Sequence, residues 1–365
     1  MKTIHHKYTE SLPGGSSPQI RAHLMDITCV ALLFIFMPVL FQSCRKELCY
    51  NHWEHSMSVK AEVDASYVQE WEQSGWEEKW DEEAFGVQYS GLLPDIPSGL
   101  KVVSYRASGG YEERNVAAGG AVVPLAEGYQ SILFYNNDTE YIVFDNTESS
   151  ATAVATTRTR TRFALNGQTK TETRGVNSPD MLYGHYIDEW YGERKIEPDY
   201  MPVEMKPLVF TYLLLFKFDS GFQYVKKARG ELDGMAAGVY LNSGTTVDES
   251  AIVLFEEESC MLDPDAGMVI AAVRSFGIPG YPNGSYATKA EDMEFGMVLE
   301  VEMTNGATKK FETDISQQMG KYPHGGVIIA SGLTITDEEG GAAGGGFQVD
   351  VDGWGEYEDI PLPLG

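Results

Sequence analysis

Residues 208–216 read LVFTYLLLF, an almost wholly apolar run that Lys217 and the turn-forming Asp219-Ser220-Gly221 close. A run of this length is too short to span a bilayer, but it suits a strand that is buried on both faces. It therefore predicts a core β-strand. Because long windows of the chain show no helical periodicity, the sequence predicts an all-β fold.

Short runs with strand character recur on both sides of this segment, separated by turn residues such as Gly-Gly, Glu-Gly and Asn-Asn-Asp. The clearest is VLEVEMTNGATKKFE at 298–312, where Asn305-Gly306 predicts a hairpin with a type I′ turn. The spacing is typical of a β-sandwich. Strands are predicted at 56–64, 100–105, 121–125, 130–135, 140–145, 208–216, 238–241, 251–255, 268–276, 297–303, 309–313, 327–336 and 347–351.

The 365 residues suffice for about two domains, and a shift in composition suggests where they meet. Between residues 147 and 179 the chain is rich in Thr, Ser and Ala and holds the basic residues Arg158, Arg160, Arg162, Lys170 and Arg174. We therefore predict sandwiches at 57–150 and 179–365, joined by a linker or edge segment at 151–178. The alternation of Thr and Arg at 157–162 fits an edge strand, and a trypsin-like protease could cut the segment from Arg158 to Arg174 if it is exposed.

The N-terminal part of the chain predicts export. Residues 27–43, ITCVALLFIFMPVLFQS, are uncharged and have the length of a signal-peptide core. Ser43 precedes Cys44, an arrangement that resembles a relaxed bacterial lipobox. We predict a signal peptide at 1–43, lipidation of Cys44 and a tether at 44–56. The alternative is an uncleaved anchor helix, and both interpretations place the remainder outside the cytosol.

Charge and cysteine content limit the partners and the covalent framework. The net charge of −27 repels phosphate backbones, so nucleic acid is not expected as a partner. If Cys44 carries lipid, only Cys49 and Cys260 remain in the exported part, which excludes a disulfide framework. Whether these two form one bridge or stay free is open at this point.

The residues with catalytic or metal-binding chemistry are few and scattered. Cys49, His52 and His55 are of types that suit zinc, but the sequence has no second cluster to complete a site. His185 and His324 lie outside any nucleophile motif. We therefore predict no catalytic residues, no metal site, no cofactor and no enzymatic activity.

Two further clusters have a functional and a structural interpretation. Trp71, Trp76 and Trp80 lie in an acidic stretch at 68–83 that predicts a surface helix or an inserted loop. They could form a glycan-stacking surface, or they could pack this element onto a sheet. The acidic residues between Asp350 and Asp359 could bind calcium, but they match no calcium-loop motif and are better explained as solvated surface.

Four stretches together resemble fimbrillin-type lipoproteins, the minor fimbrial subunits and anchors of Bacteroidales, in an uncharacterised branch of that family. They are CRKELCY at 44–50, KPLVFTYLL at 206–214, ARGELDGMA at 228–236 and GGFQVDVD at 345–352. The resemblance extends from about residue 44 to the end.

This resemblance implies two tandem transthyretin-like β-sandwich domains, a lipid on Cys44 that anchors the chain in the outer membrane, and strand exchange with other fimbrial subunits. The expected function is that of a surface-exposed fimbrial anchor, accessory or tip subunit in adhesion. A glycan-binding surface lipoprotein that uses Trp71, Trp76 and Trp80 is the alternative, and a hydrolase ranks last. The adhesion ligand and the leaflet that holds the lipid stay open.

Overall fold

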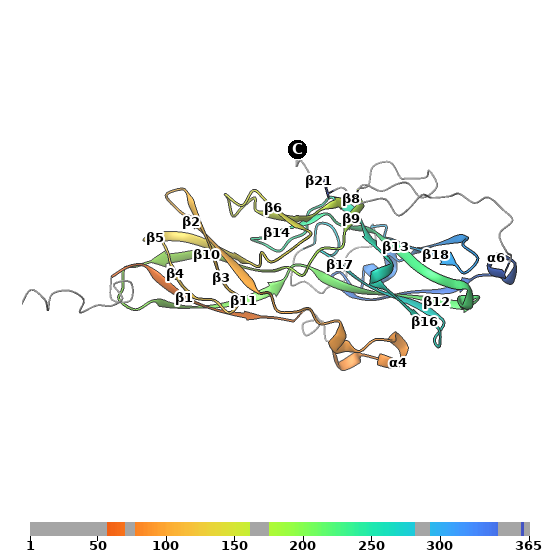
Figure 1. Cartoon of the computed structure of the whole chain (residues 1–365). Helices are drawn as coiled ribbons and strands as arrows, with labels where there is room; N and C mark the ends of the chain where they lie inside the picture. Colours follow the sequence, from red (N-terminus) through yellow and green to blue (C-terminus); the bar gives the residue numbers. More distant parts are fainter. Residues whose placement is uncertain (1–56, 70–76, 161–174, 282–292, 342–358, 361–365) are drawn as a thin grey trace, which may run out of the picture. The chain divides into compact units, whose positions relative to one another are not determined.

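The computed structural model describes residues 57–69, 77–160, 175–281, 293–341 and 359–360. This part of the chain is built mainly from β-strands, which confirms the predicted all-β fold (Figure 1). No helix among these residues has the length and apolar character that crossing a membrane requires. The helices are single turns: η2 (Glu77–Lys79), α4 (Glu82–Phe85), η3 (Tyr89–Gly91), η5 (Phe222–Tyr224), η6 (Glu257–Ser259), α5 (Ser316–Met319) and α6 (Asp337–Gly341).

The first hydrophobic core lies between a seven-stranded sheet, of order β3-β2-β5-β10-β11-β1-β4, and a three-stranded sheet, of order β14-β7-β6. Both sheets contribute fully buried side chains, such as Leu133 of β5 and Ala155 of β7. The strands are β1 (Lys60–Tyr67), β2 (Gly99–Arg106), β3 (Tyr111–Ala117), β4 (Val122–Pro124), β5 (Gly128–Tyr135), β6 (Ile142–Asp145), β7 (Val154–Thr157), β10 (Tyr183–Gly192), β11 (Asp199–Pro207) and β14 (Gly238–Tyr240).

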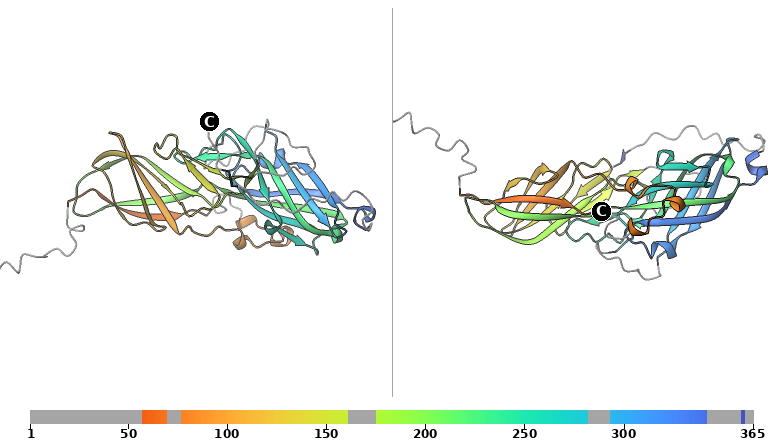
Figure 2. Two further views of the ribbon diagram at one scale, coloured as in Figure 1. Left: turned by 45° about the horizontal axis from the view of Figure 1, so that its top comes forward. Right: turned by 90° about the horizontal axis from the view of Figure 1, so that it is seen from below.

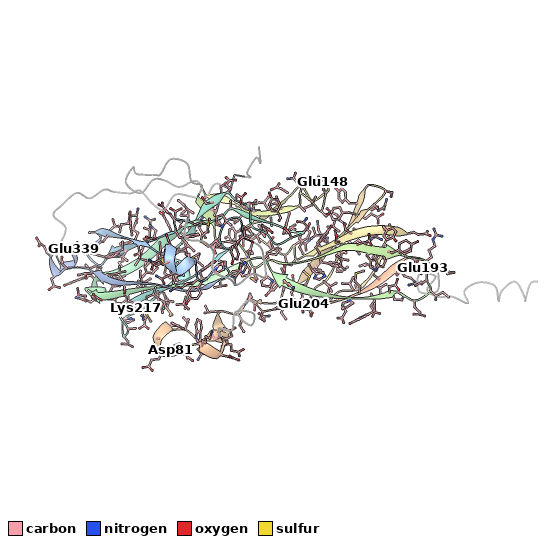
Figure 3. The ribbon with its side chains drawn as sticks, turned by 180° about the vertical axis from the view of Figure 1, so that it is seen from behind. Asp81, Glu148, Glu193, Glu204, Lys217 and Glu339 are labelled. Atoms are coloured by element: carbon pink, nitrogen blue, oxygen red, sulfur yellow. The ribbon has the colours of Figure 1, made fainter. Side chains whose placement is uncertain are left out.

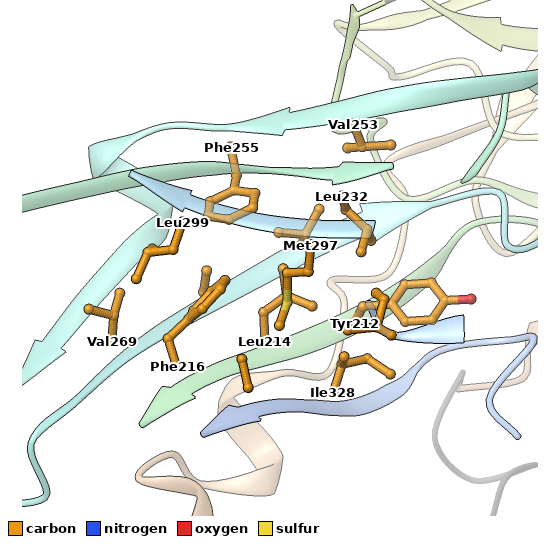
Figure 4. Close-up of a cluster of buried hydrophobic side chains, with 14 of the residues drawn as sticks. Tyr212, Leu214, Phe216, Leu232, Val253, Phe255, Val269, Met297, Leu299 and Ile328 are labelled. Carbon is orange, nitrogen blue, oxygen red and sulfur yellow. The ribbon is translucent and has the colours of Figure 1, made fainter. Parts of the chain in front are cut away.

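The second core lies between a four-stranded sheet, of order β16-β17-β12-β20, and a seven-stranded sheet, of order β19-β18-β13-β15-β9-β8-β21. Figure 4 shows side chains of the two sheets facing each other, among them Phe216, Phe255 and Met297. The strands are β8 (Thr159–Arg160), β9 (Gly175–Asn177), β12 (Phe210–Ser220), β13 (Val225–Ala236), β15 (Ser250–Phe255), β16 (Cys260–Asp263), β17 (Met268–Ser275), β18 (Gly296–Met303), β19 (Thr308–Asp314), β20 (Gly326–Thr334) and β21 (Asp359–Ile360).

The apolar run at 208–216 forms the start of β12, which pairs antiparallel with β17 and parallel with β20. Alternate residues such as Leu214 and Phe216 point into the second core. Leu213 and Leu215 point to the opposite face and form a separate apolar cluster. The run is apolar at nearly every position because both faces of the strand are covered.

The segment at 77–92 covers this opposite face. Trp80, Phe85, Val87 and Leu92 are partly buried and pack on the cluster around Leu215. Figure 2 shows this segment, in orange, against the sheet that contains β12. The predicted surface helix or loop at 68–83 is therefore a surface element with two short helical turns over its described part, and it is docked on the second sandwich.

The described strands pass from one sandwich to the other at five places along the chain: β7 to β8, β9 to β10, β11 to β12, β13 to β14, and β14 to β15. The segment predicted as a linker, 151–178, contains the buried strand β7. The second sandwich was predicted to begin at residue 179, but the two strands that follow this residue, β10 and β11, pair with β5 and β1 of the first sheet. The pairing therefore places the passage along this part of the chain after Pro207.

The predicted hairpin at 298–312 is present as β18 and β19, but its turn differs from the expectation. The Met303 N–H donates to Ala307 O, so the loop has three residues, and Gly306 alone in it adopts a positive φ, of 83°. This is the geometry of a three-residue loop that ends in a left-handed glycine, whereas a type I′ turn would also need a positive φ at Asn305. The Asn305 side chain instead accepts a hydrogen bond from the Ala307 N–H.

Replacing Leu214 by alanine should lower the free energy of unfolding by about 3 kcal/mol, because the side chain is 0 % exposed and its removal leaves a cavity. Urea denaturation measures the loss. Ile196→Ala is the control, since this side chain is 51 % exposed and its loss should cost less than about 0.5 kcal/mol. Equal losses for both variants would contradict the assignment of β12 as the core strand.

Candidate functional site

Strand β1 occupies a groove in the first sandwich, and both strands that pair with it there, β11 and β4, are distant in the sequence. It runs parallel to β11 from Ala61 opposite Asp199 to Tyr67 opposite Met205. On its other side it pairs antiparallel with β4, and the N–H groups of Val63 and Ala65 donate to the carbonyls of Ala121 and Gly119. Parallel neighbours cannot be joined by a tight turn, so the strand is held by its groove and not by a local hairpin.

The side chains of β1 alternate between the groove and solvent. Ala61 and Val63 point inward and are at most 3 % exposed, whereas Glu62 and Asp64 lie at the surface. Ala61 and Val63 pack in the first core together with Val203 of β11. This alternation is what a single added strand needs in order to fill an apolar groove with every second residue.

The C-terminal end of β1 is held by Tyr67. Its ring packs edge-on against Tyr183 at a centroid distance of 5.2 Å, and its hydroxyl donates to Ala118 O at 2.9 Å. Burial, and secondly the carboxylate of Asp138, raises the pKa of Tyr67 to about 12. The hydroxyl therefore stays protonated as a donor across the physiological range.

The backbone around Gly120 approaches β1 closely. A Cβ atom at this position would lie 2.1 Å from Val63 O, and the residue has a φ of 98°, so only glycine fits without displacement. On the opposite side of β1, the Tyr200 hydroxyl donates to Asp64 at 2.6 Å. Contacts on both sides of β1 thus hold the strand in its groove.

The other sheet edges are poor sites for strand pairing. Edge strands β3 and β19 carry rows of charged side chains, and β4, β16, β6 and β14 have only three or four residues. Edge strand β20 is blocked in its middle: Gln318 Nε2 donates to Ile329 O, and the Ile329 N–H donates to Gln318 Oε1, both at 2.8 Å. A side-chain amide therefore takes the place of a neighbouring strand.

Acidic side chains are spread over the surface. Figure 3 shows Glu148, Glu193 and Glu204 directed away from the strands, and all three are exposed. Such a surface repels other polyanions, in agreement with the net charge of −27. This surface is compatible with partners that bind through backbone pairing or through neutral polar groups.

Only some of the predicted site residues lie within the described part of the chain. Cys44, the Cys49, His52 and His55 cluster, Trp71 and Trp76 lie outside the described residues. Trp80 is described and packs at 4.8 Å from Phe85 and 5.6 Å from Tyr89, while its Nε1 donates to Val87 O. This contact pattern agrees with the packing interpretation of Trp80.

The two histidines considered in the sequence, His185 and His324, make packing or hydrogen-bond contacts within the fold. His185 Nδ1 lies 2.9 Å from Glu204 O, and burial lowers the pKa of this imidazole. His324 is buried and packs on Phe210 and Tyr281. In the described ranges no group of three or more His, Cys, Asp or Glu side chains could hold a metal ion. Of the C-terminal acidic cluster, only Asp359 falls within the described residues.

Strand β11, which forms one wall of the groove, was not predicted from the sequence. Met201, Val203, Met205 and Pro207 are buried in strict alternation with exposed residues, a pattern that could have identified the strand. Pro202 and Pro207 obscured it, because proline is uncommon inside strands. That β11 pairs with β1 is visible only in the folded chain.

Cys260 lies in β16 and is a free thiol in the structure. Burial, followed by Glu256, Glu257 and Glu258, raises its pKa from 9.0 to about 12. A half-buried thiol with three acidic neighbours is a poor nucleophile at neutral pH.

Alkylation of Cys260 at pH 8 should be at least about tenfold slower in the native chain than in urea, because the fold suppresses the thiolate. Peptide mass spectrometry after timed iodoacetamide treatment measures the rate at this residue. The unfolded thiol ionises near pH 9.0 and the folded one only near 12, so this group favours unfolding as the pH rises through that window. Equal native and denatured rates would contradict the burial.

Comparison with known proteins places these features in context. Residues 89–256 match a family model described as "Domain of unknown function (DUF5119)". Among curated proteins, the chain is 22% identical over 302 residues to the "Putative fimbrium anchoring subunit Fim4B" of Bacteroides ovatus, covering 76% of this chain and 88% of that protein.

The fold resembles that of a solved structure. A crystal structure described as a "putative adhesin" from Bacteroides ovatus matches with a TM-score of 0.52 and 20% identity, covering 76% of this chain and 94% of that one. "The fimbrial anchor protein Mfa2 from Porphyromonas gingivalis" matches with a TM-score of 0.41 and 11% identity, covering 74% of this chain and 90% of that one. The comparisons confirm the predicted resemblance to fimbrial proteins of Bacteroidales.

Proposed function

We propose that this chain, given its likeness to fimbrial anchoring subunits and adhesins of Bacteroidales, is a cell-surface fimbrial subunit of the anchor, accessory or tip type. In this proposal it is a structural protein of adhesion and not an enzyme. It joins other subunits by β-strand addition, and a lipid on Cys44 holds it in the outer membrane. The curated relative is named for anchoring a fimbrium, which supports the class of function.

The observation that carries the proposal is the groove filled by β1. This strand is bonded along both sides and buries Ala61 and Val63 there, while its neighbours in the sheet, β11 and β4, lie more than 50 residues away along the chain. A strand supplied by another subunit would meet the same row of backbone donors and acceptors and the same apolar pockets. Because the other sheet edges are short, charged or blocked by a side chain, this groove is the favoured place for strand exchange.

A strand supplied in trans should enter this groove. We would insert a protease site at 70–76, cut the folded chain there, and follow exchange of its own strand for a fluorescent peptide of residues 57–69 by anisotropy. A peptide carrying Val63→Asp should bind at least about 100-fold more weakly, because it places a charge in an apolar groove.

The matched control is a peptide carrying Glu62→Ala, which changes the neighbouring, exposed position of the same strand and should bind like the unmodified peptide. Failure of the unmodified peptide to exchange, in a cut chain that keeps its circular dichroism spectrum, would count against strand addition. So would equal affinity of the Val63→Asp and Glu62→Ala peptides.

Lipidation and surface location require a separate experiment on whole cells. Labelling with a palmitate analogue should mark the wild-type chain and not a Cys44→Ala variant, because only the thiol can receive the lipid. Protease added to intact cells should degrade the labelled protein if it faces outward. Label on the Cys44→Ala variant would refute the predicted lipid site, and full protection from protease would refute surface exposure.

A further inference from the structure

A cavity of about 440 Å³ lies on the outer face of the three-stranded sheet β14-β7-β6. The loop that leads into β15, at residues 247–250, and Val176 of β9 form its other walls. Cavities of about 300 to 1,000 Å³ are the size that holds small ligands in proteins. This one is distinct from the β1 groove, and nothing in the proposed function uses it.

The strand register explains which side chains reach the cavity. In β7, Ala153 and Ala155 point into the first core, so Val154 and Thr156 point to the outer face. Tyr240 of β14 pairs with Val154 and lines the cavity beside it. Thr156 pairs with Gly238 in the same ladder, so the tyrosine and the threonine both line the cavity from this face of the sheet.

The lining is graded from apolar to polar. Val154 and Val176 form a buried floor, and the Tyr240 ring is 39 % exposed. The rim carries exposed oxygen-bearing side chains, among them Asp248 and Glu249, and the described residues that line the cavity include no lysine, arginine or histidine. A ligand for this lining therefore needs an apolar face and several hydrogen-bond donors, and need not be anionic.

A buried hydroxyl points to a missing partner. Thr156 is 5 % exposed, and its Oγ1 makes no hydrogen bond within the described part of the chain. A buried polar atom without a partner costs free energy, so such atoms often mark a place that a ligand or water completes. Asp145 of β6 pairs with Val154 of β7, and its Oδ2 is also buried without a hydrogen-bond partner among the described residues. Burial raises the pKa of its carboxyl group.

We propose that this cavity binds a carbohydrate unit of one or two neutral pyranose rings. The C–H face of a pyranose would lie on Tyr240, and its hydroxyls would donate to the rim oxygens and exchange a hydrogen bond with Thr156. A metal ion fits less well, because the described residues contain no cluster of metal-ligating side chains. The inference does not depend on subunit assembly.

Saturation-transfer NMR and titration calorimetry test the proposal. The probes are glucose, galactose, mannose, fucose, N-acetylglucosamine, lactose and maltose at millimolar concentration against the intact chain. At least one should bind, and Tyr240→Ala should weaken it by roughly 5- to 10-fold through loss of the aromatic face. Thr156→Val keeps the side-chain shape, removes the hydroxyl, and should weaken binding by roughly 3- to 10-fold.

Tyr191→Ala is the matched control, since Tyr191 is 55 % exposed on β10 and does not line the cavity. This variant should bind like the unmodified chain. Melting temperatures show whether each variant folds, and Thr156→Val remains informative if Tyr240→Ala does not. The proposal is overturned if no probe binds, if binding survives both cavity variants, or if Tyr191→Ala weakens it equally.

Discussion

The burial of β12 on both faces is the constraint on which the rest of the second sandwich depends. Leu214 and Phe216 face the core, whereas Leu213 and Leu215 need a cover on the other side. The segment at 77–92 supplies this cover although it lies between β1 and β2 of the first sandwich. Hydrophobic burial thus fastens a long insertion of one sandwich onto the other.

Strands that pass between the two cores extend this coupling. Val209 belongs to the first core and Phe210 to the second, and Met235 and Ala236 divide in the same way. Adjacent residues that serve different cores leave no flexible linker at these positions. A load on one sandwich would therefore pass to the other along hydrogen-bonded strands, as the proposed role of a subunit between a membrane anchor and a fibre would require.

The two proposed sites use opposite properties of β-structure. The β1 groove offers backbone groups in a row with apolar pockets beneath, and therefore accepts a strand. The cavity beside β7 offers side-chain oxygens around a tyrosine and therefore suits a small polyhydroxylated ligand. Blocking of β20 by Gln318 and the charged edges β3 and β19 keep unwanted strands away from the remaining edges.

The sequence by itself determined the all-β class, the core strand at 208–216 and the hairpin around Asn305-Gly306, because apolar runs and turn residues act locally. It also determined the acidic surface and the resemblance to fimbrial proteins. Only the tertiary structure decided that β10 and β11 complete the first sheet, that β1 lies between β11 and β4, and that Tyr240 and Thr156 line one cavity. These features join residues about 50 to 140 positions apart, and no local pattern encodes which distant strands will pair.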